Sequence, residues 1–213
     1  MEPFIHNHHF NYIQQQIYIL QYSVKSVHDK EILSAIRYEA ERKITSIFTS
    51  LTEEQKRLVT SFSDLHQEHE FYGYLESLLP YRVMFPYMTE VEVKNLFPNK
   101  KMDVPALSYI NFKAISYLGW NDHQLQKKYI IYPFKGRIRA IEAHITSIQQ
   151  KNVCALCNQF TKVGLVTAQT ENSSGAYYKA VGNYICMDSY ECNRNITNIA
   201  NVDTFVERIV TGE

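Results

Sequence analysis

Apolar residues recur every three or four positions through the first hundred residues, which is the period of an amphipathic helix. One such stretch runs from Phe10 to Val27, and a second follows Asp29, a residue type that caps helix N-termini. The segment from Thr52 to Gln55 is a capping box that predicts a third helix, and Phe71–Leu79 is a fourth apolar segment. Short connections between helices of these lengths predict an antiparallel bundle.

The pattern changes near residue 100, where we expect a domain boundary. Thr89 is a candidate cap for one last short helix, from Glu90 to Phe97, which Pro98 would end. Beyond Pro105 the chain is rich in β-branched and aromatic residues, which favour strands. The predicted strands are Ala114–Leu118, Lys128–Tyr132 and Arg137–Ala143. Pro133–Gly136 is predicted to be the turn between the last two strands.

All four cysteines lie in the last third of the chain, as a C-x-x-C pair at Cys154 and Cys157 and a second pair at Cys186 and Cys192. The stretch between the pairs is long enough for a hairpin, and a helix is expected from Cys192 to Val210. The predicted hairpin consists of strands Thr161–Ala168 and Ala176–Val181 with the turn Glu171–Gly175.

This spacing of thiols favours a structural zinc site, because zinc binds four soft ligands in a tetrahedron and four cysteines leave no position open for water. Knuckle, hairpin and helix together would form a treble clef. Two alternatives are disulfides in a secreted domain and a redox C-x-x-C motif. The first ten residues have no apolar signal core, and no βαβ unit precedes the motif, so we favour zinc over both.

The sequence therefore predicts an α+β protein with two domains. Residues 1–100 are expected to form the N-terminal antiparallel helical bundle, and residues 101–213 a C-terminal β-containing treble-clef zinc-finger domain. No window approaches a membrane-spanning apolar run. Cysteine usage and the absence of a signal sequence lead us to expect a cytoplasmic protein.

Charge helps to choose between partner classes. The net charge is zero, but residues 1–90 hold 8 Lys and Arg against 12 Asp and Glu, residues 91–140 hold 9 against 3, and residues 141–213 hold 5 against 7. A zinc finger that binds nucleic acid is normally basic, because contacts with phosphates supply most of the affinity. The slightly acidic cysteine-containing segment therefore favours a protein partner. The basic middle segment leaves RNA binding or ribosome binding as the alternative.

Motifs for catalysis are missing. The sequence has no nucleophile elbow, no P-loop and no dinucleotide fingerprint. The histidines of the His6–His9 cluster lie far from the cysteines in the chain, and His66 and His69 have no further ligand at matching spacing. We therefore expect a protein that is not an enzyme and has no catalytic residues.

Several longer motifs resemble those of the FusB-type proteins, the elongation factor G-binding family that includes fusidic acid resistance proteins. The resemblance spans essentially the whole chain. The motifs that carry it are Asn11–Ile13, Asp29–Glu31, Tyr117–Asn121, Lys128–Ile131, Cys154–Asn158, Gly182–Ser189 and Cys192–Asn193.

The resemblance implies a helical bundle joined to a treble-clef zinc domain with one structural zinc ion. It also implies that the chain binds elongation factor G and helps it to leave ribosomes on which fusidic acid has trapped it, through transient ribosome association. The family's partner-binding positions carry over to Tyr184 and Phe205. Two further positions, a phenylalanine and a lysine in the family, are Val153 and Val181 here.

Two hypotheses of different classes follow. The first is an adaptor that binds elongation factor G through the zinc domain and protects translation against fusidic acid. The second is an RNA-binding zinc protein in translation that uses the basic middle segment. The candidate phosphate-binding residues are Lys100, Lys101, Lys127, Lys128, Lys135, Arg137 and Arg139.

Overall fold

The computed structural model describes residues 1–170 and 179–212, with only the backbone of Gln149. The chain forms two compact units, Met1–Val83 and Met84–Glu213. The division lies earlier than the boundary expected near residue 100, because the helix capped by Thr89 belongs to the second unit. Its Val93 packs in one core cluster with Leu118 and Tyr129 of the sheet.

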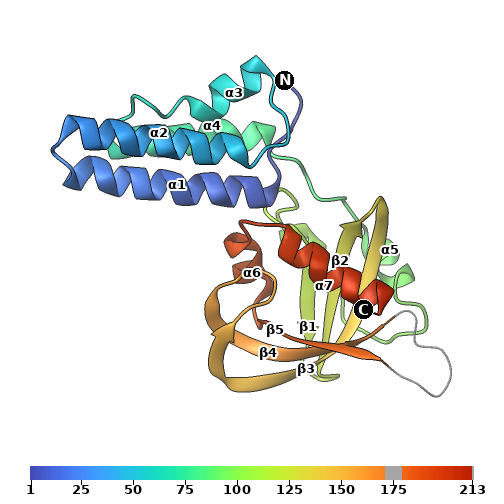
Figure 1. The fold of residues 1–213 in the computed structure, drawn as a ribbon. Helices are drawn as coiled ribbons and strands as arrows, with labels where there is room; N and C mark the ends of the chain where they lie inside the picture. The colour runs from blue at the N-terminus through green and yellow to red at the C-terminus, as the bar shows by residue number, and fades with distance from the viewer. Residues whose placement is uncertain (171–178, 213) are drawn as a thin grey trace. The chain divides into compact units, whose positions relative to one another are not determined.

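The first unit is helical, as the apolar period predicts (Figure 1). Its elements are α1 (Asn7–Ser26), α2 (Lys30–Ser46), α3 (Glu53–Thr60), α4 (Glu68–Leu78) and the 3₁₀ turn η1 (Leu79–Tyr81). α1 and α2 lie side by side and run antiparallel, and their apolar stripes share one core with α3 and α4. The central residues of that core include Ile13, Ile17, Leu20, Ile44, Phe62, Phe71 and Leu78.

The predicted caps are confirmed. The Asp29 carboxylate accepts hydrogen bonds from the backbone N–H groups of Glu31 and Ile32, at 2.8 and 3.2 Å. Thr52 and Gln55 exchange the two bonds of a capping box. Each such cap stabilises a helix by about 1 kcal/mol, because it satisfies N–H groups that the helix itself leaves unpaired.

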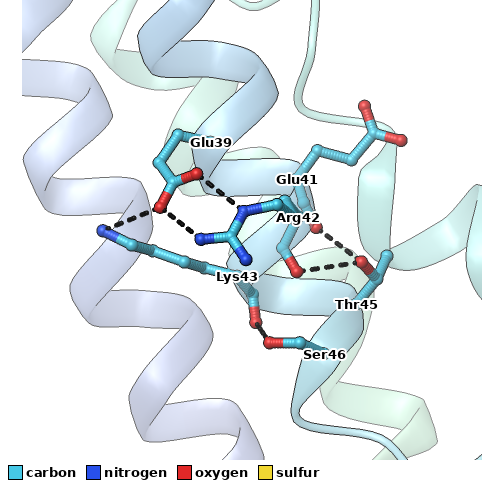
Figure 2. A network of polar contacts seen from close by, with 6 residues as sticks. All are labelled: Glu39, Glu41, Arg42, Lys43, Thr45 and Ser46. Carbon is cyan, nitrogen blue, oxygen red and sulfur yellow. Dashed lines mark hydrogen bonds and ion pairs between the residues drawn. The ribbon is translucent and has the colours of Figure 1, made fainter.

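The end of α2 carries a polar network (Figure 2). Arg42 donates two hydrogen bonds of 2.8 Å to the Glu39 carboxylate, and the Lys43 ammonium lies 3.6 Å from it. The hydroxyls of Thr45 and Ser46 donate to backbone carbonyls of the preceding turn. All these contacts lie within one stretch of α2, and ion pairs at exposed positions are weak because solvent screens them, so the network supports the helix and does not indicate a functional site.

The second unit is built on a five-stranded antiparallel sheet in which each strand pairs with the next along the chain. Its elements are α5 (Glu90–Asn95), η2 (Leu107–Tyr109), β1 (Leu118–Asp122), β2 (Lys127–Phe134), β3 (Arg137–Val153), β4 (Phe160–Gln169), β5 (Ala180–Cys186), α6 (Ser189–Asn195) and α7 (Ala200–Thr211). α7 crosses one face of the sheet in Figure 1. β2 and β3 meet at a two-residue turn in which Lys135 and Gly136 both have positive φ, the geometry that tight hairpins require.

Both faces of β2 are covered. Ile130 and Tyr132 face the cluster that contains α7, whereas Tyr129 and Ile131 face the cluster that contains α5. In the second cluster the Trp120 and Tyr129 rings stack at 5.1 Å, and Phe97 packs edge-on against both. Because successive strand residues point to opposite faces, a strand buried on both sides reads as a continuous apolar run, here residues 129–132.

Two predicted elements are wrong in their bounds. Ala114–Leu118 is not a strand, since the Ser116 and Tyr117 N–H groups bond to the Asn193 side chain and β1 begins only at Leu118. The C-terminal helix is two helices. Ile196 leaves the helical conformation after α6, and the Asn198 side chain accepts a bond from the Ala200 N–H group at the start of α7.

The C-terminal hairpin is confirmed in part. β4 contains the predicted strand Thr161–Ala168, and β5 continues beyond Val181 to Cys186. The predicted turn Glu171–Gly175 and the start of the second predicted strand, from Ala176, lie outside the described residues.

The close approach of Tyr117 to β1 leads to a first prediction. A Cβ added at Gly119 would lie 2.4 Å from the Tyr117 Cε2 atom, whereas a Cβ at Gly182 in the same sheet would meet nothing nearer than 3.9 Å. Gly119→Ala should lower the free energy of unfolding by about 1–3 kcal/mol, the usual effect of overpacking. Urea denaturation measures this, with Gly182→Ala as the matched control, and equal stability of the two variants would contradict it.

Candidate metal centre and the adjoining surface

Four thiols converge beside the sheet from three separate segments. Cys154 and Cys157 lie in the turn between β3 and β4, Cys186 ends β5, and Cys192 lies in α6. Their sulfur atoms all lie within 4.8 Å of one another, and all four residues are buried. The Cys154–Cys192 and Cys157–Cys186 sulfur pairs are 3.8 and 3.5 Å apart. Disulfide sulfurs would be about 2 Å apart, so the cysteines are free thiols and the disulfide alternative is excluded.

The local backbone explains why the first pair forms a tight knuckle. The Asn158 N–H group donates to the Cys154 carbonyl at 2.9 Å, and Asn158 has φ +58°, a left-handed conformation that asparagine tolerates. The N–H groups of Leu156 and Cys186 each donate to the Cys154 sulfur at 3.4 Å. These bonds aim backbone dipoles at a sulfur and favour its thiolate form.

The cluster fits a tetrahedral zinc ion. Zinc–sulfur bonds of about 2.3 Å place the sulfurs of a tetrahedron about 3.8 Å apart, close to the separations observed. Hydrogen bonds from the neighbouring thiols, above all that of Cys157, lower the pKa of Cys154. Hydrogen bonds with the other thiols, above all that of Cys154, raise the pKa of Cys192. Because the four sulfur atoms lie so close together, all four can be thiolates only when a cation between them offsets their mutual repulsion. With four protein ligands the ion would be structural, holding knuckle, β5 and α6 together.

A buried asparagine ties this cluster to the sheet. The Asn193 side-chain oxygen accepts from the Ser116 and Tyr117 N–H groups at 2.7 and 3.2 Å. Its amide group donates to the carbonyls of Tyr117 and Ser189 at 3.0 and 2.9 Å. Asn193 thus fixes α6, which carries Cys192, against the segment before β1. In the sequence, Asn193 stands out only as part of a motif, because nothing in its immediate neighbourhood indicates a hydrogen-bond partner 76 residues away.

The proposed partner-binding residues divide into two groups. Tyr184 and Val153 are 39% and 47% exposed, whereas Val181 and Phe205 are buried in the core beneath α7. As they lie, Val181 and Phe205 offer no surface to a partner. Direct contact between these two residues and a partner stays a prediction.

Tyr184 and Val153 belong to two exposed apolar pairs next to the cysteine knuckle. Tyr184 lies directly opposite Leu165 on β4, and Val153 lies directly opposite Phe160. Phe160 and Leu165 are exposed as well, the former by 69%. The Ala155 N–H group in the knuckle donates to the Tyr184 carbonyl at 2.7 Å, which joins the two pairs. We call Val153, Phe160, Leu165 and Tyr184 the knuckle surface.

Four of the seven candidate phosphate-binding residues in the basic middle segment are either paired with a carboxylate or buried. Lys100 and Lys127 both pair with Glu142, at 3.2 and 3.0 Å, and Lys135 pairs with Glu207 at 2.6 Å. Lys128, the fourth candidate, is fully buried. These contacts remove much of the positive charge that phosphate binding would need.

Comparison with known proteins bears on both units. A family model described as "Elongation factor G-binding protein, N-terminal" matches residues 4–86, and one described as "FBP C-terminal treble-clef zinc-finger" matches residues 97–209. The chain belongs to the FusB-type family of elongation factor G-binding proteins. No curated protein sequence matches it.

A solved structure supports the same assignment. The chain shares 27% identity with the fusidic acid resistance protein FusC, over 96% of this chain and 97% of that one, with a TM-score of 0.79. Membership of the family confirms the predicted fold class, a helical N-terminal unit followed by a sheet-containing treble-clef unit. Together with the four convergent thiols it supports one structural zinc ion per chain. In the described part of this family member, no helix is long and apolar enough to cross a bilayer.

Removal of the metal gives a second prediction. Chelation of zinc should destabilise the second unit, because the free energy of metal binding at a structural site is part of the free energy of folding. Elemental analysis should find one zinc per chain, and thermal unfolding should occur at a lower temperature after chelation. Adding zinc back should restore the original transition, as the control for irreversible damage. A metal-free chain of unchanged stability would contradict the structural role.

Proposed function

We propose that the chain binds elongation factor G through the knuckle surface and favours release of the factor from ribosomes stalled by fusidic acid. The observation that carries the proposal is the joint match to both units of the elongation factor G-binding family. The likeness to FusC, named as a fusidic acid resistance protein, supports the link to the drug. The proposed role is target protection and not chemistry on the drug.

The knuckle surface has the properties of an interface core. Monomeric proteins rarely expose clustered large apolar side chains unless these bind something, and tyrosine is enriched among residues that dominate binding energy. The surface is also held rigidly, because Tyr184 is two residues from Cys186 on β5 and its carbonyl is bonded to the knuckle. A preformed surface loses little conformational entropy on binding.

Release requires more than affinity. A protein with equal affinity for the ribosome-bound and the free form of its partner would not change the equilibrium between the two forms. The proposed adaptor must therefore bind the released conformation of elongation factor G more strongly. A preference of about 1.4 kcal/mol shifts that equilibrium tenfold.

The third prediction separates contact from core packing. Tyr184→Ala should weaken binding of elongation factor G by about tenfold or more without changing stability or zinc content, because the side chain is partly exposed and packs at the proposed interface. Isothermal titration calorimetry measures the affinity. Tyr109→Ala is the matched control, since Tyr109 is 89% exposed in η2, outside the knuckle surface. Unchanged affinity of Tyr184→Ala would place the interface elsewhere.

Phe205 provides the contrasting variant. Phe205→Ala should lower the free energy of unfolding by about 3–5 kcal/mol, since it removes a buried ring from the core. Any loss of affinity should then be accompanied by loss of stability in chemical denaturation. A Phe205→Ala variant that is fully stable but does not bind would restore the direct contact role expected from the family resemblance.

A fourth prediction concerns release itself. Adding the chain to ribosomes that hold elongation factor G with fusidic acid should move the factor from the ribosome pellet to the supernatant, and Tyr184→Ala should reduce this effect in proportion to its lost affinity. Sedimentation measures the distribution, with Tyr109→Ala as control. If the chain binds the free factor tightly yet releases none of it, binding stands and the release step is wrong.

A further inference from the structure

Lys128 is a fully buried lysine beside the cysteine cluster. Together with Arg82 of the first unit, it is one of two cationic side chains buried among the described residues. Side chains two residues apart on a strand point to the same face of the sheet, so the Lys128 side chain lies on the same face of β2 as that of Ile130. A lysine is rarely buried without a compensating partner, because removing an ammonium group from water has a large free-energy cost.

The surroundings of Lys128 use every hydrogen atom of a charged ammonium. Its nitrogen donates to the Asn121 side-chain oxygen at 3.0 Å, the Ser189 hydroxyl at 2.9 Å and the Cys186 carbonyl at 3.3 Å. An ammonium has three donors and no acceptor, which matches this set of three oxygens. Asn121 is held in turn, since its amide group donates to the Met187 carbonyl at 2.6 Å.

No carboxylate forms an ion pair with Lys128 within the described residues. The acidic groups close enough to act on its charge are instead the thiols of Cys192, Cys186 and Cys154, together with Asp188, the N-cap of α6. Two of its three hydrogen-bond acceptors belong to the segment between two metal ligands: the carbonyl of Cys186, which is itself a ligand, and the hydroxyl of Ser189, three residues before Cys192.

The charge of the metal centre supplies the missing partner. A divalent zinc ion with four thiolate ligands carries a net charge of −2, and burial makes that charge unfavourable unless positive charge lies nearby. We propose that Lys128 is the internal counter-ion of the zinc centre, offsetting half of its net negative charge and thereby slowing loss of zinc. This inference depends on the metal centre and not on the binding of elongation factor G.

The experiment compares charge with hydrogen bonding. Lys128→Gln removes the charge but keeps donors, and Lys128→Met removes both. Lys127→Gln is the matched control, because Lys127 is the adjacent residue and pairs with Glu142 instead. Transfer of zinc from the folded chain to a chromophoric chelator gives the dissociation rate and, at equilibrium, the affinity. Both Lys128 variants should bind zinc about 10- to 100-fold more weakly, the usual effect of losing an outer-shell partner, and Lys127→Gln should match the unaltered chain.

A double-mutant cycle isolates the electrostatic effect. Cys157→His replaces a thiolate by a neutral imidazole, so the zinc centre then carries a net charge of −1. If Lys128 acts through its charge, Lys128→Gln should weaken zinc binding severalfold less in the Cys157→His background than in the original one. A purely structural lysine would give the same loss in both backgrounds.

The outcomes decide the proposal. Coupled losses, with Lys128→Gln close to Lys128→Met, support the counter-ion. A Lys128→Gln variant that keeps full zinc affinity would overturn it, as would losses that are equal in the two backgrounds. If Lys128→Gln fails to fold even with saturating zinc, recovery of folding and zinc content in the Cys157→His double variant supports the proposal, and failure to recover contradicts it.

Discussion

The second unit depends on the convergence of four thiols from segments that are distant in the chain. Cys154 and Cys157 arrive after the longest strand, Cys186 ends another, and Cys192 lies on a helix of only 7 residues. Such a short helix is not stable alone, so its position depends on what holds Cys192 and its neighbour Asn193. The metal centre, through Cys192, and the hydrogen bonds of Asn193 hold adjacent residues of this one helix. The knuckle surface is rigid because it is attached to this same centre.

Much of the architecture could be predicted from local physical chemistry. Caps at Asp29, Thr52 and Thr89 are recognisable because each cap is completed within three residues. The four zinc ligands are recognisable because C-x-x-C spacing already brings two thiols together. Strand β2 is recognisable from an apolar run that only a strand covered on both faces would show.

Two predictions that differ from the structure share one cause, which is that contacts with residues distant in the sequence override the local pattern. Residues 114–118 have strand composition, yet the N–H groups of Ser116 and Tyr117 bond to the Asn193 side chain and not to a neighbouring strand. Lys128 looks like one of a row of surface cations, yet strand alternation turns it inward while its neighbour Lys127 remains near solvent. Phe205 and Val181 are a different case: resemblance alone assigns them to the partner interface, they are buried in this structure, and their contact role stays a prediction.

The aromatic stack in the second unit has a consequence for observing the molecule. Trp120 is the only tryptophan in the chain, and it lies against Tyr129 and Phe97 in a core of the sheet. Fluorescence excited selectively at tryptophan therefore comes from the second unit and does not report on the unfolding of the helices in the first unit. The 16 tyrosines, by contrast, are spread over both units. The fluorescence of Trp120 can therefore be used to follow the zinc-containing unit separately within the whole chain.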